Sequence, residues 1–332
     1  MAKHAKKTNI LTSMVCLVAI LGLSLAATAQ SKKVLFKLED PLGDDHGDGR
    51  LVYPLISDFE KGDLDLLSLT ARRVSGGTRF EAYFAKDIKR ADRESVDDLG
   101  TQLNTIARYG FYTFNIDIYI DKDREPGSGL IRMLPGREAE VTPEFAWERV
   151  ICLTPLPNEA TNRLRRLVVK SMKGTMMEES EGRLDEEALQ EFRDSVPGDI
   201  EEKAFFPTRI NVRNRTIDFT VPNEFLGGSA DPNWGYVIVI TAADTIQSID
   251  MSKAAYMARG TRENFMAVPV SPGTWQNRIG GGREGEALQP PIMEMLVPDG
   301  SKQEMLLDDY STKQNRPARL PGIVPAEEPS GS

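Results

Sequence analysis

The sequence predicts a mainly β protein, an antiparallel β-sandwich with a helical insertion at residues 159–205. Two observations lead to this fold class. Many short segments of strand character follow one another with turn residues between them, which is typical of sandwiches and related folds. One charged stretch in the middle of the chain has helical spacing instead. We expect a single domain at residues 30–314, followed by a Pro-rich disordered tail at residues 315–332.

The clearest strand is FYTFNIDIYI at residues 111–120, in which alternate positions carry large apolar side chains. That face is expected to point to the core. The other face carries Asn115 and Asp117 and is expected to be at least partly wet. The continuous apolar run GYVIVIT at residues 235–241 predicts a central strand.

Two hairpins and two helices complete the expected elements. The hairpins lie at residues 64–85, with Ser-Gly-Gly at the turn, and at residues 209–221, with Arg-Asn-Arg at the turn. Residues 163–173 and 184–196 are charged and have helical spacing. We interpret them as a helical excursion from the sheet that is solvated on one side.

The N-terminus has the residue order of a secretory signal peptide. Three lysines precede an apolar run at residues 10–27, and the run ends in Ala-Thr-Ala. Cleavage is predicted after Ala29, which makes residues 1–29 the signal peptide. An uncleaved anchor is the alternative, since the run is about long enough to span a thin bilayer. No later segment is long and apolar enough, so we expect an exported chain, periplasmic or at the cell exterior, with no membrane span after cleavage.

The charge of the chain argues against nucleic acid as a partner. The full sequence has 41 basic and 50 acidic residues, a net charge of −9. Cleavage after Ala29 would remove three lysines and no acids, which leaves a net charge of −12. Phosphate backbones are bound by concentrated Lys and Arg, and this composition lacks that excess.

The mature chain would keep one histidine, His46, and one cysteine, Cys152. Ser-His-Asp triads, Cys-His pairs and multi-histidine zinc sites all need imidazole near other reactive groups. His46 lies in a Gly/Asp-rich stretch and near no nucleophile motif. His-dependent catalysis is therefore not expected. One cysteine cannot form an intrachain disulfide, so stability must come from the core or from bound ions.

An acidic, glycine-rich stretch at residues 40–49 is the most distinctive local motif. Its carboxylates, with glycines that let the backbone present carbonyl groups, suit calcium, which takes about six to eight oxygen ligands. The predicted calcium ligands are Asp40, Asp44, Asp45 and Asp48. The alternative is a solvated turn in which Asp side chains bond their own backbone. Asp121 and Asp123 follow the strongest strand and form a second candidate oxygen cluster, with a plain loop as the alternative.

Glycan binding usually needs an exposed aromatic face with polar groups around it. The candidate platforms in this sequence are Trp275, Trp234, Tyr236 and Tyr53. Trp275 follows Ser-Pro-Gly and is the best exposed candidate, with an anchoring role in its own loop as the alternative. Trp147 lies in a predicted strand and is assigned to the core.

No catalytic residues are predicted. Glycosidases need two carboxylates about 5–10 Å apart, and nothing in the sequence singles out one such pair among 50 acidic residues. The glycine-rich segment at residues 280–285 lacks the Lys-Ser/Thr of a phosphate loop. We therefore expect a non-catalytic protein. An unrecognised carbohydrate-active hydrolase is kept as the third possibility.

The order of short motifs along the chain resembles the C-terminal domain family of bacterial glucodextranases. The motifs, in order, are DPLGDDHGDG at residues 40–49, Tyr53-Pro54, Phe59, Gly62, DLDL at 63–66, DIYID at 117–121, LPGR at 134–137, FAWE at 145–148, Val221-Pro222, WGY at 234–236, GGR at 281–283, and MLVPDG at 295–300. The resemblance covers roughly residues 35–325. The charged stretch at residues 159–205 is not part of the pattern.

The resemblance implies a β-sandwich similar to carbohydrate-binding modules, with a role in glycan binding or cell-surface attachment and not in hydrolysis. The partner implied is a polysaccharide or a cell-envelope glycan. The alternative is an envelope structural or assembly protein that binds a protein partner through the helical insertion at residues 159–205.

Overall fold

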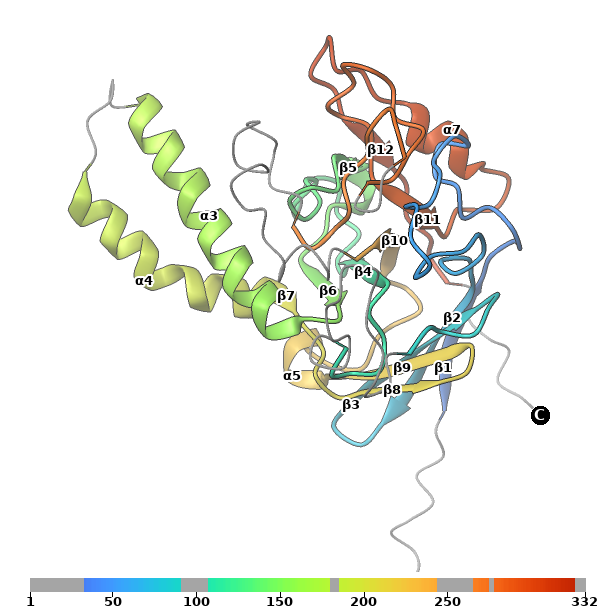
Figure 1. Ribbon diagram of the computed structural model, residues 1–332. Coiled ribbons are helices and arrows are strands. Elements are labelled where there is room, and N and C mark those ends of the chain that lie inside the picture. The colour runs from blue at the N-terminus through green and yellow to red at the C-terminus, as the bar shows by residue number, and fades with distance from the viewer. Residues whose placement is uncertain (1–32, 91–106, 180–184, 244–264, 275–277, 326–332) are drawn as a thin grey trace, which may run out of the picture.

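The computed structural model describes residues 33–90, 107–179, 185–243, 265–274 and 278–325 (Figure 1). Within these residues, two five-stranded sheets share one hydrophobic core, and two short strands form a third sheet. The predicted mainly β fold is confirmed. The proposed signal peptide lies outside the described residues.

The first sheet has the strand order β1-β2-β3-β9-β8, and all neighbouring strands in it are antiparallel. Its strands are β1 (Val34–Glu39), β2 (Leu66–Val74), β3 (Gly77–Phe84), β8 (Ile210–Arg213) and β9 (Thr216–Pro222). The two predicted hairpins are β2–β3 and β8–β9. Asn214 has a φ of 48° in the second turn, a left-handed conformation that asparagine adopts more readily than most residues.

The second sheet has the strand order β11-β10-β4-β6-β7. Its strands are β4 (Phe114–Asp121), β6 (Arg149–Leu153), β7 (Ala204–Phe205), β10 (Gly235–Ala242) and β11 (Ile292–Met295). β6 and β7 run parallel, and the other pairs are antiparallel. The third sheet pairs β5 (Ala139–Val141) with β12 (Ala318–Leu320) in parallel, and a 3-10 helix, η1 (Pro143–Phe145), follows β5.

The core between the two large sheets is built from alternate residues of their strands. The inward residues of β4 are the apolar ones, as the alternation predicts: Phe114, Ile116, Ile118 and Ile120. Ring contacts join the sheets, since Phe84 of β3 lies 4.8 Å from Phe114 and Phe36 of β1 lies 4.8 Å from Tyr236 of β10, centre to centre. Each well-packed aromatic pair contributes about 0.5–1.5 kcal/mol beyond its buried area.

The other face of the second sheet is buried as well, which corrects the expectation that it is partly wet. All eight residues of β4 are buried, including Asn115 and Asp117. A second apolar cluster covers this face, with contributions from the helical insertion and the C-terminal segment. The polar side chains are paired inside it. Arg137 Nε donates to Asp117 Oδ2 at 2.6 Å, and Asn115 Nδ2 donates to Thr241 Oγ1 at 3.0 Å.

The helical insertion consists of α3 (Pro157–Glu179) and α4 (Glu186–Lys203), which project from the sheets as a pair (Figure 1). Asp185 caps α4 by accepting hydrogen bonds from two backbone N–H groups of its first turn. Near the sheets, Ala160 and Leu164 of α3 and Val196 and Ile200 of α4 are buried. No helix in the described part of the chain is apolar over a length that could cross a membrane.

The segment expected to be a disordered tail is partly structured. Ala318 and Leu320 of β12 are fully buried, and β12 pairs with β5. Ile323 exchanges two backbone hydrogen bonds with Tyr236, at 2.8 and 2.9 Å. The expectation was wrong for residues 315–325. The proline content of this segment suggested disorder, but its apolar residues Ala318 and Leu320 alternate with Arg319 and form a short strand. Residues 326–332 lie outside the described residues. Two shorter helices, α5 (Asn223–Leu226) and α7 (Gln303–Asp308), complete the described elements.

Candidate metal centre

The acidic loop after β1 lies against β11. Gly43 and Gly47 have φ values of 95° and 59°, in the left-handed region that glycine adopts without strain. The Gly47 N–H donates to the Met293 carbonyl at 2.9 Å, and a Cβ on Gly47 would lie 2.6 Å from the Ile292 carbonyl oxygen. A side chain at this position would push the loop away from β11. This close approach brings the loop carboxylates to Glu294.

Asp40, Asp44 and Glu294 form a cluster of three carboxylates. One carboxylate oxygen from each residue lies within 4.8 Å of the other two. Asp40 directly follows β1, whereas Glu294 lies in β11 and is fully buried. Asp65, which precedes β2, accepts a hydrogen bond from the Gly43 N–H at 2.8 Å, and its charge acts on Asp40. The cluster thus joins residues from both large sheets.

Several oxygen atoms of this cluster are buried without a hydrogen-bond partner among the described residues. They are Oδ1 and Oδ2 of Asp40, Oδ1 of Asp44, Oδ1 of Asp65 and Oε2 of Glu294. His46 acts on Asp44 and Arg215 acts on Asp65, and each interaction lowers the pKa of the carboxyl group concerned. Buried carboxylate oxygens without partners are costly, so the cluster needs protons or a cation.

Burial is the main cause of raised pKa values in this cluster. It raises the pKa of Asp40 to about 7, and the charges of Asp44 and Asp65 act in the same direction. It raises the pKa of Glu294 well above the usual value, with the charge of Asp40 as the next cause. Burial also raises the pKa of Asp65 to about 6, with a contribution from the charge of Asp45. Without a cation, the Asp40–Glu294 pair is expected to hold a proton near neutral pH.

The donor set fits calcium. Calcium takes carboxylate and carbonyl oxygens at about 2.3–2.6 Å, so two ligand atoms on one ion are at most about 5 Å apart, and the oxygens of Asp40, Asp44 and Glu294 all lie within 4.8 Å of one another. Magnesium needs shorter distances of about 2.0–2.1 Å in near-octahedral geometry. The cluster contains no histidine or cysteine, which zinc prefers.

Asp45 and Asp48, two of the predicted ligands, make other contacts. Asp45 Oδ2 accepts hydrogen bonds from the Tyr53 hydroxyl and from a backbone N–H, although its Oδ1 remains buried without a partner. Asp48 Oδ2 accepts from Arg50 Nη2 at 3.0 Å and from Gln289 Nε2 at 2.9 Å. Asp48 is therefore neutralised by an arginine, and the structure corrects its assignment to the cluster.

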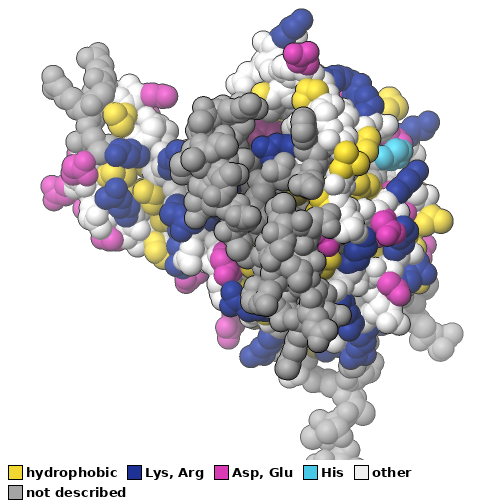
Figure 2. All heavy atoms as spheres, in the orientation of Figure 1, with side chains coloured by type: hydrophobic (Ala, Val, Ile, Leu, Met, Phe, Trp, Pro, Cys, Tyr) yellow, Lys and Arg dark blue, Asp and Glu magenta, His cyan; other side chains and the backbone are white. Residues whose placement is uncertain are grey.

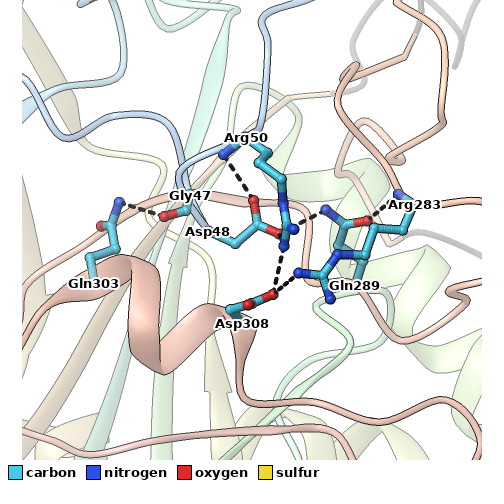
Figure 3. A network of polar contacts seen from close by, with 7 residues as sticks. All are labelled: Gly47, Asp48, Arg50, Arg283, Gln289, Gln303 and Asp308. Carbon is cyan, nitrogen blue, oxygen red and sulfur yellow. Dashed lines mark hydrogen bonds and ion pairs between the residues drawn. The ribbon is translucent and has the colours of Figure 1, made fainter.

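A polar network fixes the far side of the acidic loop (Figure 3). Asp308 Oδ1 of α7 accepts hydrogen bonds from Arg50 Nη2 and from Arg283 Nη2, both at 2.6 Å. Gln303 Nε2, at the start of α7, donates to the Gly47 carbonyl at 3.2 Å. The paired residues are 258 and 256 positions apart in the chain. The C-terminal part of the chain thus sets the position of the N-terminal loop.

The second candidate cluster is Asp121 and Asp123, to which the structure adds Glu148. Most of its oxygens already have partners. Asp121 Oδ1 accepts from the Arg124 N–H at 2.8 Å, and Glu148 Oε2 accepts from the Lys122 N–H at 2.7 Å. The Arg124 guanidinium also lies 3.7 Å from Asp121 Oδ2. Backbone amides and an arginine therefore already stabilise the negative charge of these carboxylates, as a bound cation would.

The two acidic clusters lie near opposite ends of β10. Glu294 pairs with Ile240, whereas Asp121 pairs with Gly235, five residues earlier on the same strand. Five residues of strand span about 17 Å. One ion cannot bridge the two clusters.

The predicted aromatic platforms are mostly occupied by internal contacts. Tyr236 is fully buried and packs on Phe36, which corrects its assignment as a platform. Tyr53 is partly buried, and its hydroxyl is bonded to the acidic loop. Trp234 is partly exposed, with a lysine ammonium 5.3 Å from a ring centre. Trp275 lies outside the described residues.

Comparison with known proteins agrees with the resemblance seen in the motifs. Residues 35–322 match the family described as the SLH-like C-terminal binding module of glucodextranase. No curated protein matches the chain. The matched family is a binding module rather than a catalytic domain, and the match covers both large sheets, the acidic loop and the helical insertion. The chain therefore belongs to the family of SLH-like C-terminal binding modules of glucodextranase.

Proposed function

We propose that this protein is an exported, non-catalytic module that binds a glycan, either a polysaccharide or a component of the cell envelope. The observation that carries the proposal is the family match over residues 35–322, which describes a binding module. Export is supported by the charged, apolar and small-residue order of the N-terminus.

The proposal is tested by retention of the purified mature chain on insoluble polysaccharides and on peptidoglycan sacculi, compared at equal mass. We expect at least one of these materials to retain the protein well above an unrelated acidic protein of similar size. Retention by none of them would contradict glycan binding. Soluble sugar that accumulates with time in the same tubes would contradict a non-catalytic role, and would favour the hydrolase alternative instead.

We further infer that Asp40, Asp44 and Glu294 hold a calcium ion that serves structure rather than chemistry. The support is the all-oxygen donor set, its spacing and the buried oxygens without partners. Asp65 lies close enough to act on Asp40 and adds negative charge. A calcium ion here would replace the shared proton and join the end of β1 to β11.

The second candidate function is binding of a protein partner through the helical insertion. The two helices carry opposite charge. Five bases and no acids lie in α3 between Arg163 and Lys173, whereas α4 carries seven acids and two bases. A groove of about 460 Å³ at the base of the pair is lined by apolar side chains that include Ile200, Phe205 and Phe225. A projecting charged pair beside an apolar groove is a surface of the kind that binds a folded partner.

Replacing residues 166–195 with a short Gly-Ser turn tests this second candidate. The replacement keeps the buried anchors Leu164 and Ile200 at the base of the helices. We expect any envelope protein that co-purifies with the full chain to be lost, while glycan retention stays within about twofold, because the two sheets are untouched. The matched control changes Arg165, Arg166 and Lys170 to Gln on intact helices. Equal capture of the partner by the shortened chain would exclude the insertion as its binding surface.

A further inference from the structure

The outer face of the first sheet is a polar surface that differs from both faces of the second large sheet. Alternate residues of β3 and β9 are buried in the core, and the residues between them are partly exposed. The second sheet, in contrast, is buried on both sides. If a ligand lies flat on a sheet of this sandwich, the available surface is therefore the outer face of the first sheet.

Strand register arranges this face in rows that cross the sheet. One row runs Lys37, Thr70, Glu81, Asp218 and Asn211, one residue from each of the five strands. The residues in a row are about 4.8 Å apart, as neighbouring strands are. Thr70 is only 6% exposed, so a ligand that lies across the strands meets accessible hydrogen-bonding groups on the other four strands of this row.

The neighbouring row supplies an aromatic ring. It runs Glu39, Ser68, Tyr83, Thr216 and Arg213 in the same strand order. Tyr83 is 38% exposed and is the most exposed aromatic side chain in the described residues. A groove of about 350 Å³ lies between the two rows, with Tyr83, Ser68, Thr70 and Glu81 among its lining residues. That volume is within the range of about 300–1,000 Å³ found for small-ligand sites.

Tyr83 is held in position by an arginine of the turn between β8 and β9. The Arg215 guanidinium lies 4.6 Å from the centre of the Tyr83 ring, and Arg215 Nε donates to the Phe84 carbonyl at 2.8 Å. A ring fixed in this way loses little conformational freedom when a ligand contacts it, and that lowers the entropic cost of binding. The exposed part of the ring offers an apolar contact next to hydroxyl groups.

Three ion pairs neutralise most of the charge on this face. Arg72 lies 3.8 Å from Glu81, Arg79 lies 3.5 Å from Asp218, and Lys37 Nζ lies 2.5 Å from Glu39. With Arg213 of the second row, the named side chains number four basic and three acidic, so the face presents many donors and acceptors with a net charge of only +1 and no concentrated positive field. Polyanions such as nucleic acids or acidic polysaccharides need such a field. A neutral ligand rich in hydroxyl groups does not.

We propose that a neutral polysaccharide binds across the outer face of the first sheet, with Tyr83 as its apolar contact and Lys37, Arg72 and Glu81 of the groove as its hydrogen-bonding partners. This proposal rests on the proposed glycan-binding function and names where the glycan binds. The sugar C–H face lies against the Tyr83 ring, and its hydroxyl groups pair with the hydroxyl, carboxylate and guanidinium groups beside it. It places the binding surface away from Trp234 and Tyr53.

The proposal is tested by native affinity electrophoresis of the mature chain in gels that contain dextran, soluble starch, laminarin or xylan, with alginate as the acidic comparison. We expect retardation by at least one neutral polysaccharide, little by alginate, and no loss between 50 and 500 mM salt, conditions under which contacts to a polyanion weaken strongly. Tyr83→Ala is expected to weaken the retardation at least tenfold. Trp234→Ala, at a partly exposed aromatic outside this face, is the matched control and is expected to stay within twofold.

Arg72→Gln is the second test variant, because it keeps the Tyr83 ring and replaces the guanidinium of the groove with a shorter, neutral amide. Melting curves of all variants confirm that the fold is intact. Wild-type affinity in both Tyr83→Ala and Arg72→Gln would show that the glycan does not bind to the outer face of the first sheet, but would not contradict glycan binding itself. A loss of binding in Trp234→Ala would show this most directly. No retardation of the wild type by any neutral polysaccharide, together with no retention on insoluble glycans, would overturn both proposals.

Discussion

Replacing Arg137 with Met is expected to lower the free energy of unfolding by about 3–5 kcal/mol, because it leaves a buried carboxylate without its partner. Arg137 is fully buried, and Asp117 is 1% exposed. The guanidinium donates twice to this carboxylate, from Nε to Oδ2 at 2.6 Å and from Nη2 to Oδ1 at 3.3 Å. Urea denaturation followed by circular dichroism measures the loss.

The double variant Asp117→Leu with Arg137→Met provides the internal control. It removes both charges, so it is expected to recover most of the stability that the single variant loses. Arg165→Met is the surface control. Arg165 pairs with Glu201, which is 69% exposed, and this loss should stay below about 1 kcal/mol. A single Arg137→Met variant within 1 kcal/mol of wild type would show that the buried pair contributes little to stability.

Calcium is expected to raise the melting temperature by roughly 5 °C at pH 7 when its concentration is about 100 times the dissociation constant. The effect should shrink as the pH falls toward 4. Burial raises the pKa of Asp40 to about 7 and of Asp65 to about 6, above the ordinary value of 3.8 for both. The folded, metal-free chain therefore holds protons that the unfolded chain releases near pH 4. The stability that these two groups contribute to the metal-free chain is therefore fully present below about pH 4 and is lost as the pH rises through 6 to 7.

Melting curves from pH 4 to pH 8, with chelator and with calcium, measure both effects. Glu294→Gln removes a ligand carboxylate and a buried acid whose pKa is raised by burial, so the variant should lose the calcium shift and melt higher than wild type in chelator at pH 7. Asp123→Asn, in the second cluster, is the matched control and should change neither value. Equal melting of the wild type in calcium and in chelator at pH 7 would exclude the site.

Periodicity predicted one face of the strand at residues 111–120 correctly and the other wrongly, for a physical reason. The inward face is apolar at every second position, so its burial follows from local pattern alone. On the other face, Asp117 looks like a solvent-facing residue. It is buried because Arg137, twenty positions later, neutralises it, and local periodicity contains no information about that contact.

The acidic cluster was predictable only in part. Asp40 and Asp44 belong to a dense local motif, and the structure places both in the cluster. Asp45 and Asp48 belong to the same motif, yet Asp45 accepts a hydrogen bond from a tyrosine hydroxyl and Asp48 pairs with Arg50. Glu294 lies about 250 positions after Asp44 in the chain. The sequence singles it out only as the one acidic residue in the apolar segment IMEM. A lone carboxylate in a buried strand indicates a partner, but not which one.

The polar network between the acidic loop and α7 has a consequence for how the chain folds. Gln303 and Asp308 contact residues near position 50, so the loop cannot reach its final position before the last fifth of the chain is present. Contacts between such distant segments form slowly and late. The carboxylates that would hold calcium are therefore assembled at the end of folding. A chain that is still crossing a membrane would gain no help from the ion, and binding of the ion would mark a completed domain.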